Sequence, residues 1–252
     1  MPDLHWTIPV ARWSCWPAAA SAAPEIGFIE PIVRRRLSTL SRVALKVAHD
    51  CAGNDEVRVV FASRHGELRR TTDILRAISA GQPVSPTAFS LSVLNAMTGV
   101  FGIARGDRSA ASAVSAGPET LGYALLEAYA QYASQPGSPV LLVYADEPAD
   151  PAYGTIEDEV HGGAMAILLS REGAQGDLVC TQSASSAALP ADAAQLMPPE
   201  EAHAAAAGSR TGPSARLATQ SQALQHCLET REPAAWQGAG VIWHWSWHDR
   251  AA

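Results

Sequence analysis

The stretch that decides the fold is Ser85–Ala130, which reads SPTAFSLSVLNAMTGVFGIARGDRSAASAVSAGPETLGYALLEAYA. Its first half is interrupted by Asn and Gly residues, which favour an extended segment and a turn before the next strand. The small, partly β-branched run Ala110–Ser115 predicts a short strand, and Ala116-Gly117-Pro118 predicts a sharp bend. Proline suits the start of a helix, because its φ is already helical and its missing N–H needs no partner. Glu119–Tyr132 then predicts a long apolar helix.

A strand that feeds a tight bend and then a helix is a common platform for a nucleophile in α/β enzymes. The bend projects one side chain, and the helix N-terminus stabilises negative charge. The question that this pattern raises is whether a nucleophile stands at the bend.

Composition narrows the class of protein. The chain has 252 residues, of which 47% are hydrophobic and 17% charged, so it can bury a large core and has little charge to cover its surface. A buried sheet or a protein partner follows from this balance. The formal charge of -7 argues against a nucleic-acid partner. No window is apolar enough for a membrane span, and the N-terminus lacks a secretory pattern, so we expect a soluble, cytoplasmic protein.

The cysteines are far apart in the sequence: Cys15, Cys51, Cys180 and Cys227. None forms a C-x-x-C pair, so neither a zinc site nor a redox pair is expected. A chain of this length does not need disulfides, and reduced thiols are the simpler interpretation. We expect no cofactor and no bound metal.

Elements on the N-terminal side of this stretch follow from apolar spacing. Leu4–Val10 is compatible with an edge strand. Ile32–Cys51 has apolar residues at helical spacing and predicts one helix, and Val57–Ala62 predicts a buried strand. Arg69–Ala80 predicts a second helix. Its inward face is expected to carry three aliphatic side chains, Ile74, Leu75 and Ile78.

On the C-terminal side, Val140–Tyr144 and Gly162–Leu169 are continuous apolar runs that predict buried strands. Residues 183–215 are rich in Ala, Ser, Pro and Gly, and Leu217–Leu228 predicts a short helix. Val241–His248 alternates, with tryptophans on one face, and predicts an edge strand. The tryptophan face either closes this chain's own fold, which we favour, or meets another subunit.

The continuous apolar strands, with helices between them, indicate that the fold class is α/β. They favour a mostly parallel sheet with helices on its faces.

Several ordered segments resemble a known family. They are Pro86-Thr87-Ala88-Phe89 with Asn95 and Gly99, Phe101-Gly102-Ile103-Ala104, the bend Val114–Gly117, Arg34–Ser38, and Phe61–Glu67. Together they resemble the N-terminal half of β-ketoacyl synthases, and in particular the chain-length-factor-like proteins found with aryl polyene type ketosynthases. The resemblance covers about residues 25–172. It implies a thiolase-like half-fold over residues 1–172, built on a mixed, mostly parallel sheet with helices on its faces. Residues 173–252 are then a divergent linker and tail that packs on the same domain or on a partner.

The resemblance also implies where a nucleophile should stand. A ketosynthase carries a catalytic Cys three residues before the Gly of the bend, and here that position is Val114. Ser115 is next to it, but strand alternation would point Ser115 away from the site. The histidines of the second half have no counterpart, and the Gln that often replaces the Cys in chain length factors is missing too. The catalytic set is therefore expected to be empty.

The function that follows is that of a non-catalytic, chain-length-factor-like partner of a β-ketoacyl-ACP synthase, in fatty-acid or polyketide type (aryl polyene) elongation. The resemblance implies a heterodimer with the ketosynthase, in which the strand before the nucleophile position pairs across the dimer axis. Acyl carrier protein is then an indirect partner, and a homodimer is possible. The expected pocket or interface residues are Phe89, Leu91, Leu94, Asn95, Met97, Val114, Ser115 and Gly117.

Two other functions stay open at this point. The chain could be a stand-alone acyltransferase or thioesterase that uses Ser115 or a cysteine as its nucleophile. It could also be a homodimeric module that binds an acyl group or a carrier protein.

Three further histidine or acidic patterns each have a functional and a local structural interpretation. His65 follows a strand and is either a general base or a loop residue that hydrogen-bonds locally, and the second is favoured. The acidic run Glu157–His161 is expected to be a solvated loop rather than a metal site. His244 and His248 lie about 13 Å apart along a strand, too far to share one ion.

Overall fold

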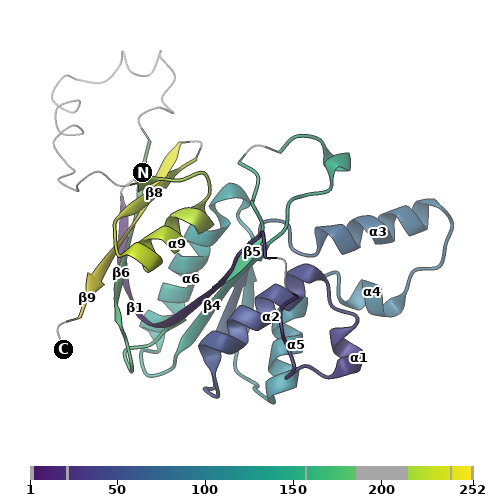
Figure 1. Cartoon of the computed structure of the whole chain (residues 1–252), viewed down its shortest axis with the longest axis horizontal. Helices are drawn as coiled ribbons and strands as arrows, with labels where there is room; N and C mark the ends of the chain where they lie inside the picture. Colours follow the sequence, from purple (N-terminus) through teal and green to yellow (C-terminus); the bar gives the residue numbers. More distant parts are fainter. Residues whose placement is uncertain (1–2, 21–22, 157, 186–214, 239, 251–252) are drawn as a thin grey trace, which may run out of the picture. The chain divides into compact units, whose positions relative to one another are not determined.

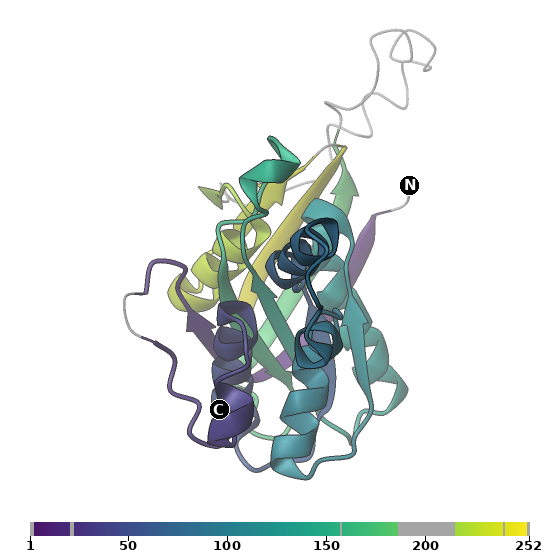
Figure 2. The ribbon, with the colours of Figure 1, turned by 90° about the vertical axis from the view of Figure 1, so that its right-hand side faces the viewer.

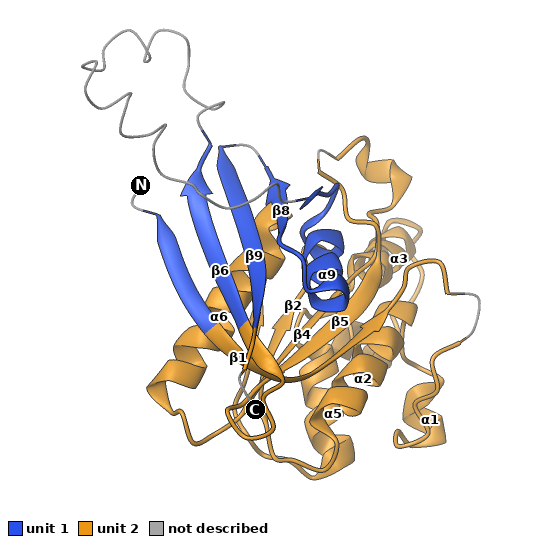
Figure 3. Cartoon of the chain, turned by 60° about the vertical axis from the view of Figure 1, so that its left-hand side comes forward, with its two compact units in different colours: residues 1–7, 178–248 blue, residues 8–177, 249–252 orange. Residues whose placement is uncertain are grey.

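The computed structural model describes residues 3–20, 23–156, 158–185, 215–238 and 240–250. Most of the low-complexity stretch 183–215, as well as Glu157, lies outside the described residues. The chain forms two compact units, one of residues 8–177 with 249–252 and one of residues 1–7 with 178–248 (Figure 3). Each unit is described by itself.

The larger unit is built on a mixed sheet with the strand order β3-β2-β4-β5-β1 (Figure 1). The strands are β1 (Leu4–Trp16, of which residues from Ile8 on belong to this unit), β2 (Arg58–Ala62), β3 (Ala111–Val114), β4 (Val140–Asp146) and β5 (Gly163–Leu169). Strand β2 is parallel to β3 and to β4, whereas β5 is antiparallel to β4 and to β1. The sequence prediction of a mixed sheet with helices on its faces is confirmed.

Helices cover both faces of this sheet. Every residue of β4 is buried, as expected for a continuous apolar strand. Its alternate side chains Leu141 and Val143 join a core cluster with helix α2 (Thr39–Ala52). Helix α6 (Thr120–Ser134) packs on β2, β3 and β4 from the other face. None of the helices that the structure describes has the length and apolarity needed to cross a membrane.

The single helix expected over Ile32–Cys51 is instead two, α1 (Pro31–Arg34) and α2. The Ser38 hydroxyl accepts a hydrogen bond from the Ser41 N–H at 3.0 Å and so caps α2. The Arg42 guanidinium donates to the Arg34 carbonyl oxygen at 2.8 Å, at the end of α1. The apolar spacing therefore identified the buried face correctly, but the capping serine set the start of the helix.

The lead-in to β3 also differs from the prediction. It contains helices α4 (Pro86–Ser90) and α5 (Ala96–Arg105) in place of an extended segment and a turn. Gly102 lies inside α5, where a Cβ atom would come within 3.0 Å of the Asp107 carbonyl oxygen. Here glycine permits a close backbone approach rather than marking a turn. Strand β3 itself agrees with the prediction, and the bend is a 3₁₀ turn (Gly117–Glu119) that leads into α6.

Helix α3 (Leu68–Ser79) forms where it was predicted, but its aliphatic face is not inward. Leu75 is 54% exposed and Ile78 is 57% exposed, and Thr72 is the buried residue of the helix. Helix α3 packs on α4, and the two helices project together from the body of the larger unit (Figure 1). The periodicity predicted the helix but not whether the rest of the chain would cover it.

The smaller unit holds β6 (Gly176–Ala184, from Leu178 on), β7 (Ala215–Arg216), helix α9 (Gln220–Thr230), β8 (Ala234–Gln237) and β9 (Val241–Asp249, to His248). Its strand order is β6-β9-β8-β7. The tail strand β9 is therefore an interior strand, and the prediction of an edge strand is wrong. Trp243 and Trp245 are fully buried, and the Trp6 ring meets the Trp243 ring edge-on at 5.9 Å. This chain itself covers the tryptophan face, which is the favoured alternative.

Candidate functional site at the carboxyl ends of the parallel strands

The parallel strands β3, β2 and β4 end on the same edge of the larger unit's sheet, at Val114, Ala62 and Asp146. Ligand sites in α/β sheets form at this edge, because the loops that follow the strands converge there. Two segments of the larger unit meet at this edge: the loop Ser63–Gly66 after β2 and the bend Ser115–Gly117 after β3. They form the candidate functional site.

Asp146 organises the loop after β2. Its carboxylate is 1% exposed and accepts hydrogen bonds from the Ser63 hydroxyl at 2.9 Å, the Arg64 N–H at 2.6 Å and the His65 N–H at 3.1 Å. Burial raises the pKa of Asp146, and the three donors act in the opposite direction. Sequence reasoning missed this residue, because its only local signal is a carboxylate at the end of an apolar strand.

Val114, which the sequence predicts at the nucleophile position, carries no nucleophilic atom. Val114 is half-buried at the end of β3, and its carbonyl oxygen accepts from the Ser63 N–H at 3.2 Å. Ser115 is exposed, and its hydroxyl donates to the Arg64 carbonyl oxygen at 3.0 Å. A serine nucleophile needs a base that accepts its proton, and a backbone carbonyl cannot do this.

A cavity of about 230 Å³ opens beside this bend. Its lining residues are Arg64, His65, Gly66, Glu67, Leu68, Thr71, Ser92, Leu94 and Ser115. Ser115 lines this cavity because β3 has ended before it, so the expectation that alternation points it away is wrong. Gly66 has φ +56°, and a Cβ atom there would come within 3.0 Å of Leu94 Cδ1. Glycine at 66 therefore lets Leu94 form one wall.

The other predicted pocket residues are scattered. Phe89 is 65% exposed on α4, Leu91 is half-buried after it, and Asn95 is exposed before α5. Gly117 stands at the bend with φ +57°. Met97 is 1% exposed and belongs to the core cluster with α2, so it cannot line the pocket of another chain. The prediction for Met97 is wrong because α5 is a helix, and that helix turns Met97 inward.

His65 pairs with the acidic loop. Its Nε2 lies 2.8 Å from Glu159 Oε1, and the same carboxylate accepts from the Val160 N–H at 2.8 Å and the Ala149 N–H at 3.3 Å. Burial opposes ionisation of Glu159, but these hydrogen bonds outweigh it and hold its pKa below the usual value. His65 thus matches the local hydrogen-bonding alternative. Within the described ranges, no group of three His, Cys, Asp or Glu side chains could hold a metal ion.

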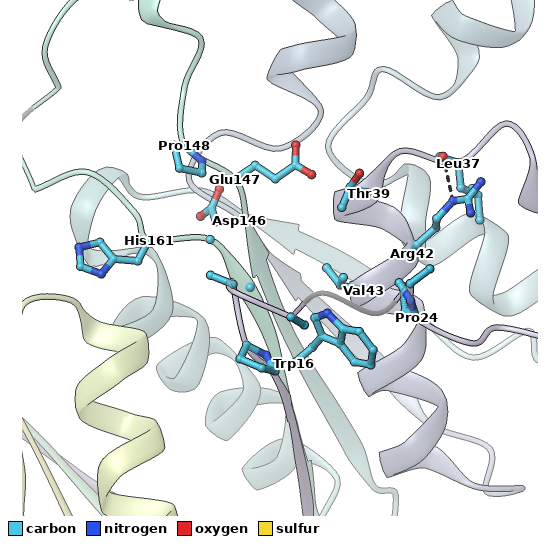
Figure 4. A pocket seen from close by; sticks show the side chains of 16 residues that line it. Trp16, Pro24, Leu37, Thr39, Arg42, Val43, Asp146, Glu147, Pro148 and His161 are labelled. Carbon is cyan, nitrogen blue, oxygen red and sulfur yellow. Dashed lines mark hydrogen bonds between the residues drawn. The ribbon is translucent and has the colours of Figure 1, made fainter.

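A second cleft of about 580 Å³ lies at the same edge, between the end of β1, the start of α2 and the end of β4 (Figure 4). Glu147 and His161 stand on one side of it, and Thr39 and Arg42 stand on the side of α2. Burial raises the pKa of Glu147, and the charge of Arg69 acts in the opposite direction. No sequence pattern indicated this cleft, because its residues come from four distant segments.

The fold and this edge together define a protein of the ketosynthase class, with a thiolase-like mixed sheet and a strand–bend–helix at its carboxyl edge. The family model for the β-ketoacyl synthase N-terminal domain matches residues 10–246, and the chain belongs to this family. The match extends beyond residues 25–172, to which the resemblance was expected to be confined, and includes most of the tail. A search of curated proteins found no match.

Solved structures share the fold. The ketosynthase (ApeO) in complex with its chain length factor (ApeC) from Xenorhabdus doucetiae matches at TM-score 0.70 and 24% identity, over 96% of this chain and 99% of that chain. The ishigamide ketosynthase/chain length factor matches at TM-score 0.64 and 13% identity, over 97% and 99%. Ketosynthase twelve of the bacillaene polyketide synthase from Bacillus amyloliquefaciens matches at TM-score 0.60 and 11% identity, over 97% and 73%.

Proposed function

We propose that this chain is a non-catalytic, chain-length-factor-like partner of a β-ketoacyl-ACP synthase, and that it shapes the acyl pocket during fatty-acid or polyketide type (aryl polyene) elongation. The observation that carries the proposal is the open outer edge of β3, the strand that ends at the nucleophile position. Within the described part of the chain, β3 has a neighbouring strand, β2, on one side only. An unpaired strand edge is a template for another chain.

The hydrogen bonds of β3 show which backbone groups are free to pair. The Val59 N–H donates to the Ala110 carbonyl oxygen at 3.0 Å, and the Ser63 N–H donates to the Val114 carbonyl oxygen at 3.2 Å. Backbone groups alternate in direction along a strand, so even-numbered residues of β3 face β2. The N–H and C=O groups of Ala111 and Ala113 therefore face the open edge. Their small side chains permit another strand to come close.

The bend after β3 supports the non-catalytic part of the proposal. Valine at 114 has no nucleophilic atom, and the Ser115 hydroxyl is committed to a backbone carbonyl. Condensation by a ketosynthase begins with attack of an activated nucleophile on an acyl thioester. The proposed partner supplies that nucleophile, and acyl carrier protein delivers substrate to the partner.

The projecting helices supply the part of the surface that would shape the partner's pocket. Bulky apolar side chains are exposed on α3, on α4 and just after α4: Leu75, Ile78, Phe89 and Val93. Grouped exposed apolar side chains mark interaction sites. We place Phe89, with Leu91 and Leu94 behind it, at the end of the partner's acyl tunnel, where bulk limits chain length.

The two ketosynthase/chain length factor structures support this proposal through fold and length, because each matched chain is covered to 99%. The direct test is co-expression with a β-ketoacyl-ACP synthase from the same source. We expect the two chains to elute together as one complex, with elongation only when both are present. Separate elution of two stable proteins, together with full activity of the ketosynthase alone, would show that the proposal is wrong.

A further inference from the structure

Helix α3 buries little of its own surface, although it carries part of the apolar patch that the proposed function requires. Thr72 is the one buried residue of this helix, and Leu75 and Ile78 are each more than half exposed. Helix α3 packs on α4, which projects from the unit with it (Figure 1). A surface helix usually holds its place by burying an apolar stripe. Since α3 does not, its position depends on other contacts.

The loop between β4 and β5 supplies such contacts. Its 3₁₀ turn, Pro151–Tyr153, lies beside α3 (Figure 2), and the hydroxyl oxygens of Tyr153 and Thr72 are 2.9 Å apart. One helical turn further along α3, the Arg76 guanidinium donates to the Asp150 carboxylate at 2.9 Å. Thr72 and Arg76 are four residues apart, so they lie on the same face of the helix. The β4–β5 loop therefore contacts α3 at successive turns of one face.

The β4–β5 loop is itself anchored to the body of the larger unit. Glu159 Oε1 lies 2.8 Å from His65 Nε2, and Glu159 Oε2 accepts from the Ala149 N–H at 3.3 Å. The Asp150 carboxylate also accepts from the Ala152 N–H at 2.9 Å, which fixes the 3₁₀ turn that contacts α3. The loop is thus a brace that connects the loop after β2 to α3.

The contacts of the brace with α3 are defined in position but are not buried. Tyr153 is 46% exposed, and the Arg76 side chain is 55% exposed, so solvent screens its ion pair with Asp150. Loss of these contacts should therefore leave the unit folded and loosen α3. Because α3 packs on α4, the looseness should extend to α4 and to Phe89, which α4 carries.

We propose that Tyr153 and Asp150 are positioning residues for the partner's acyl pocket: they hold α3, and through it α4 with Phe89, at the place where bulk limits chain length. This inference rests on the proposed function, and it adds to it two residues that lie neither on α3 nor on α4. A narrow range of product lengths needs a wall of fixed position, because a wall that moves admits chains of several lengths.

The test combines hydrogen–deuterium exchange of the free chain with the product lengths of the complex. Tyr153→Phe removes one hydroxyl, and Asp150→Asn removes the charge but keeps the oxygen that accepts from the Ala152 N–H. In the double variant we expect amide exchange to rise at least about threefold in α3 and α4 and to stay unchanged in α2 and α6, because the lost contacts resist local opening of α3 alone.

The product lengths are measured with the β-ketoacyl-ACP synthase saturated by the variant chain, so that a change in affinity does not affect the result. The double variant should spread the products over more chain lengths. Total turnover should stay within about twofold of the wild type, because neither residue touches the reacting atoms. A loss of stability alone would lower turnover without widening the range of lengths.

The matched control is the double variant Tyr129→Phe with Asp177→Asn. Tyr129 is on α6, and Asp177 pairs with Arg250 at 2.8 Å, so the control also loses one tyrosine hydroxyl and one arginine ion pair. Its α3 exchange and its product lengths should match the wild type. Arg76→Gln removes the same ion pair from the helix side. It should reproduce Asp150→Asn and add no further effect when the two are combined.

The outcomes separate this inference from the proposed function. Unchanged exchange in α3 would show that the β4–β5 loop does not hold the helix. Faster exchange in α3 with unchanged product lengths would show that the position of the helix does not set chain length. Either result overturns the inference and leaves the partnership standing. If the wild-type chain does not bind the β-ketoacyl-ACP synthase, the proposed function fails, and the positioning role fails with it.

Discussion

The Ser115 hydroxyl lies 3.0 Å from the carbonyl oxygen of Arg64 and donates its proton to it. This hydrogen bond joins the bend after β3 to the loop after β2, next to the position where the resemblance predicts a nucleophile. The contact gives Ser115 a structural role, because its proton is directed at an acceptor that cannot remove it.

Ser115 should therefore not become acylated. Incubation of the chain with acyl thioesters should leave its intact mass unchanged, and Ser115→Ala should behave like the wild type in elongation assays with the ketosynthase. Loss of one exposed hydrogen bond should lower the free energy of unfolding by about 1 kcal/mol or less. A stable acyl adduct that disappears in Ser115→Ala would instead support an acyltransferase or thioesterase.

Proline substitutions in β3 should separate partner pairing from folding. In Ala113→Pro the lost N–H faces the open edge. The chain should therefore still fold, but it should no longer bind the ketosynthase. In Ser112→Pro the lost N–H faces β2, so the free energy of unfolding should fall by about 1–3 kcal/mol. Urea unfolding and size-exclusion chromatography measure the two effects. Retention of the ketosynthase by Ala113→Pro would argue against pairing at this edge.

Phe89 and Met97 should behave in opposite ways, although they lie close together in the sequence. Phe89 is 65% exposed, so Phe89→Ala should change the free energy of unfolding by about 0.5 kcal/mol or less. Because the substitution removes bulk from the proposed end of the acyl tunnel, the partner's products should become longer. Met97 is buried in the core, so Met97→Ala should cost about 2–5 kcal/mol. Mass spectrometry of the product length tests Phe89→Ala, and thermal unfolding tests both variants. An unchanged product length with Phe89→Ala would place the tunnel end elsewhere.

Asp146 should be a strong determinant of stability. Asp146→Ala leaves the Ser63 hydroxyl and the Arg64 and His65 N–H groups without their acceptor, and we expect a loss of about 2–3 kcal/mol in the free energy of unfolding. Asp150→Ala is the comparison, because the Asp150 carboxylate pairs with the exposed Arg76 guanidinium and accepts from the Ala152 N–H. Its effect should be smaller than that of Asp146→Ala, because solvent screens an exposed ion pair. Equal effects of the two substitutions would show that the loop after β2 does not depend on Asp146.

Glu159 should make stability depend on pH in the acidic range. Its pKa in the folded chain lies below the usual 4.5, so the ionised carboxylate stabilises the fold above about pH 4.5. That contribution is lost as the pH falls through the folded-state pKa. The difference between wild type and Glu159→Gln should be about 1 kcal/mol or less at neutral pH, and it should shrink as the pH falls below the usual glutamate pKa. If the difference in unfolding free energy between wild type and Glu159→Gln grows on acidification, the contact between His65 Nε2 and the Glu159 carboxylate does not stabilise the fold.

Local patterns were enough to predict several elements. Val140–Tyr144 and Gly162–Leu169 are apolar throughout and became β4 and β5, and the small run before the bend became β3. The same kind of pattern failed where two local signals competed. The capping hydroxyl of Ser38 divided a predicted helix. Gly102 lies within helix α5, where the absence of a Cβ atom lets the Asp107 carbonyl oxygen come close.

By itself, the sequence determined the strand–bend–helix and the family, because both depend on residues that are close together in the chain. Only the tertiary structure decided which surfaces are covered. It buried Met97 and exposed Leu75 and Ile78, it made β9 an interior strand, and it brought Asp146 to the loop after β2. Burial and hydrogen bonding of this kind arise from segments distant in sequence, and the spacing of residues along one segment carries no information about them.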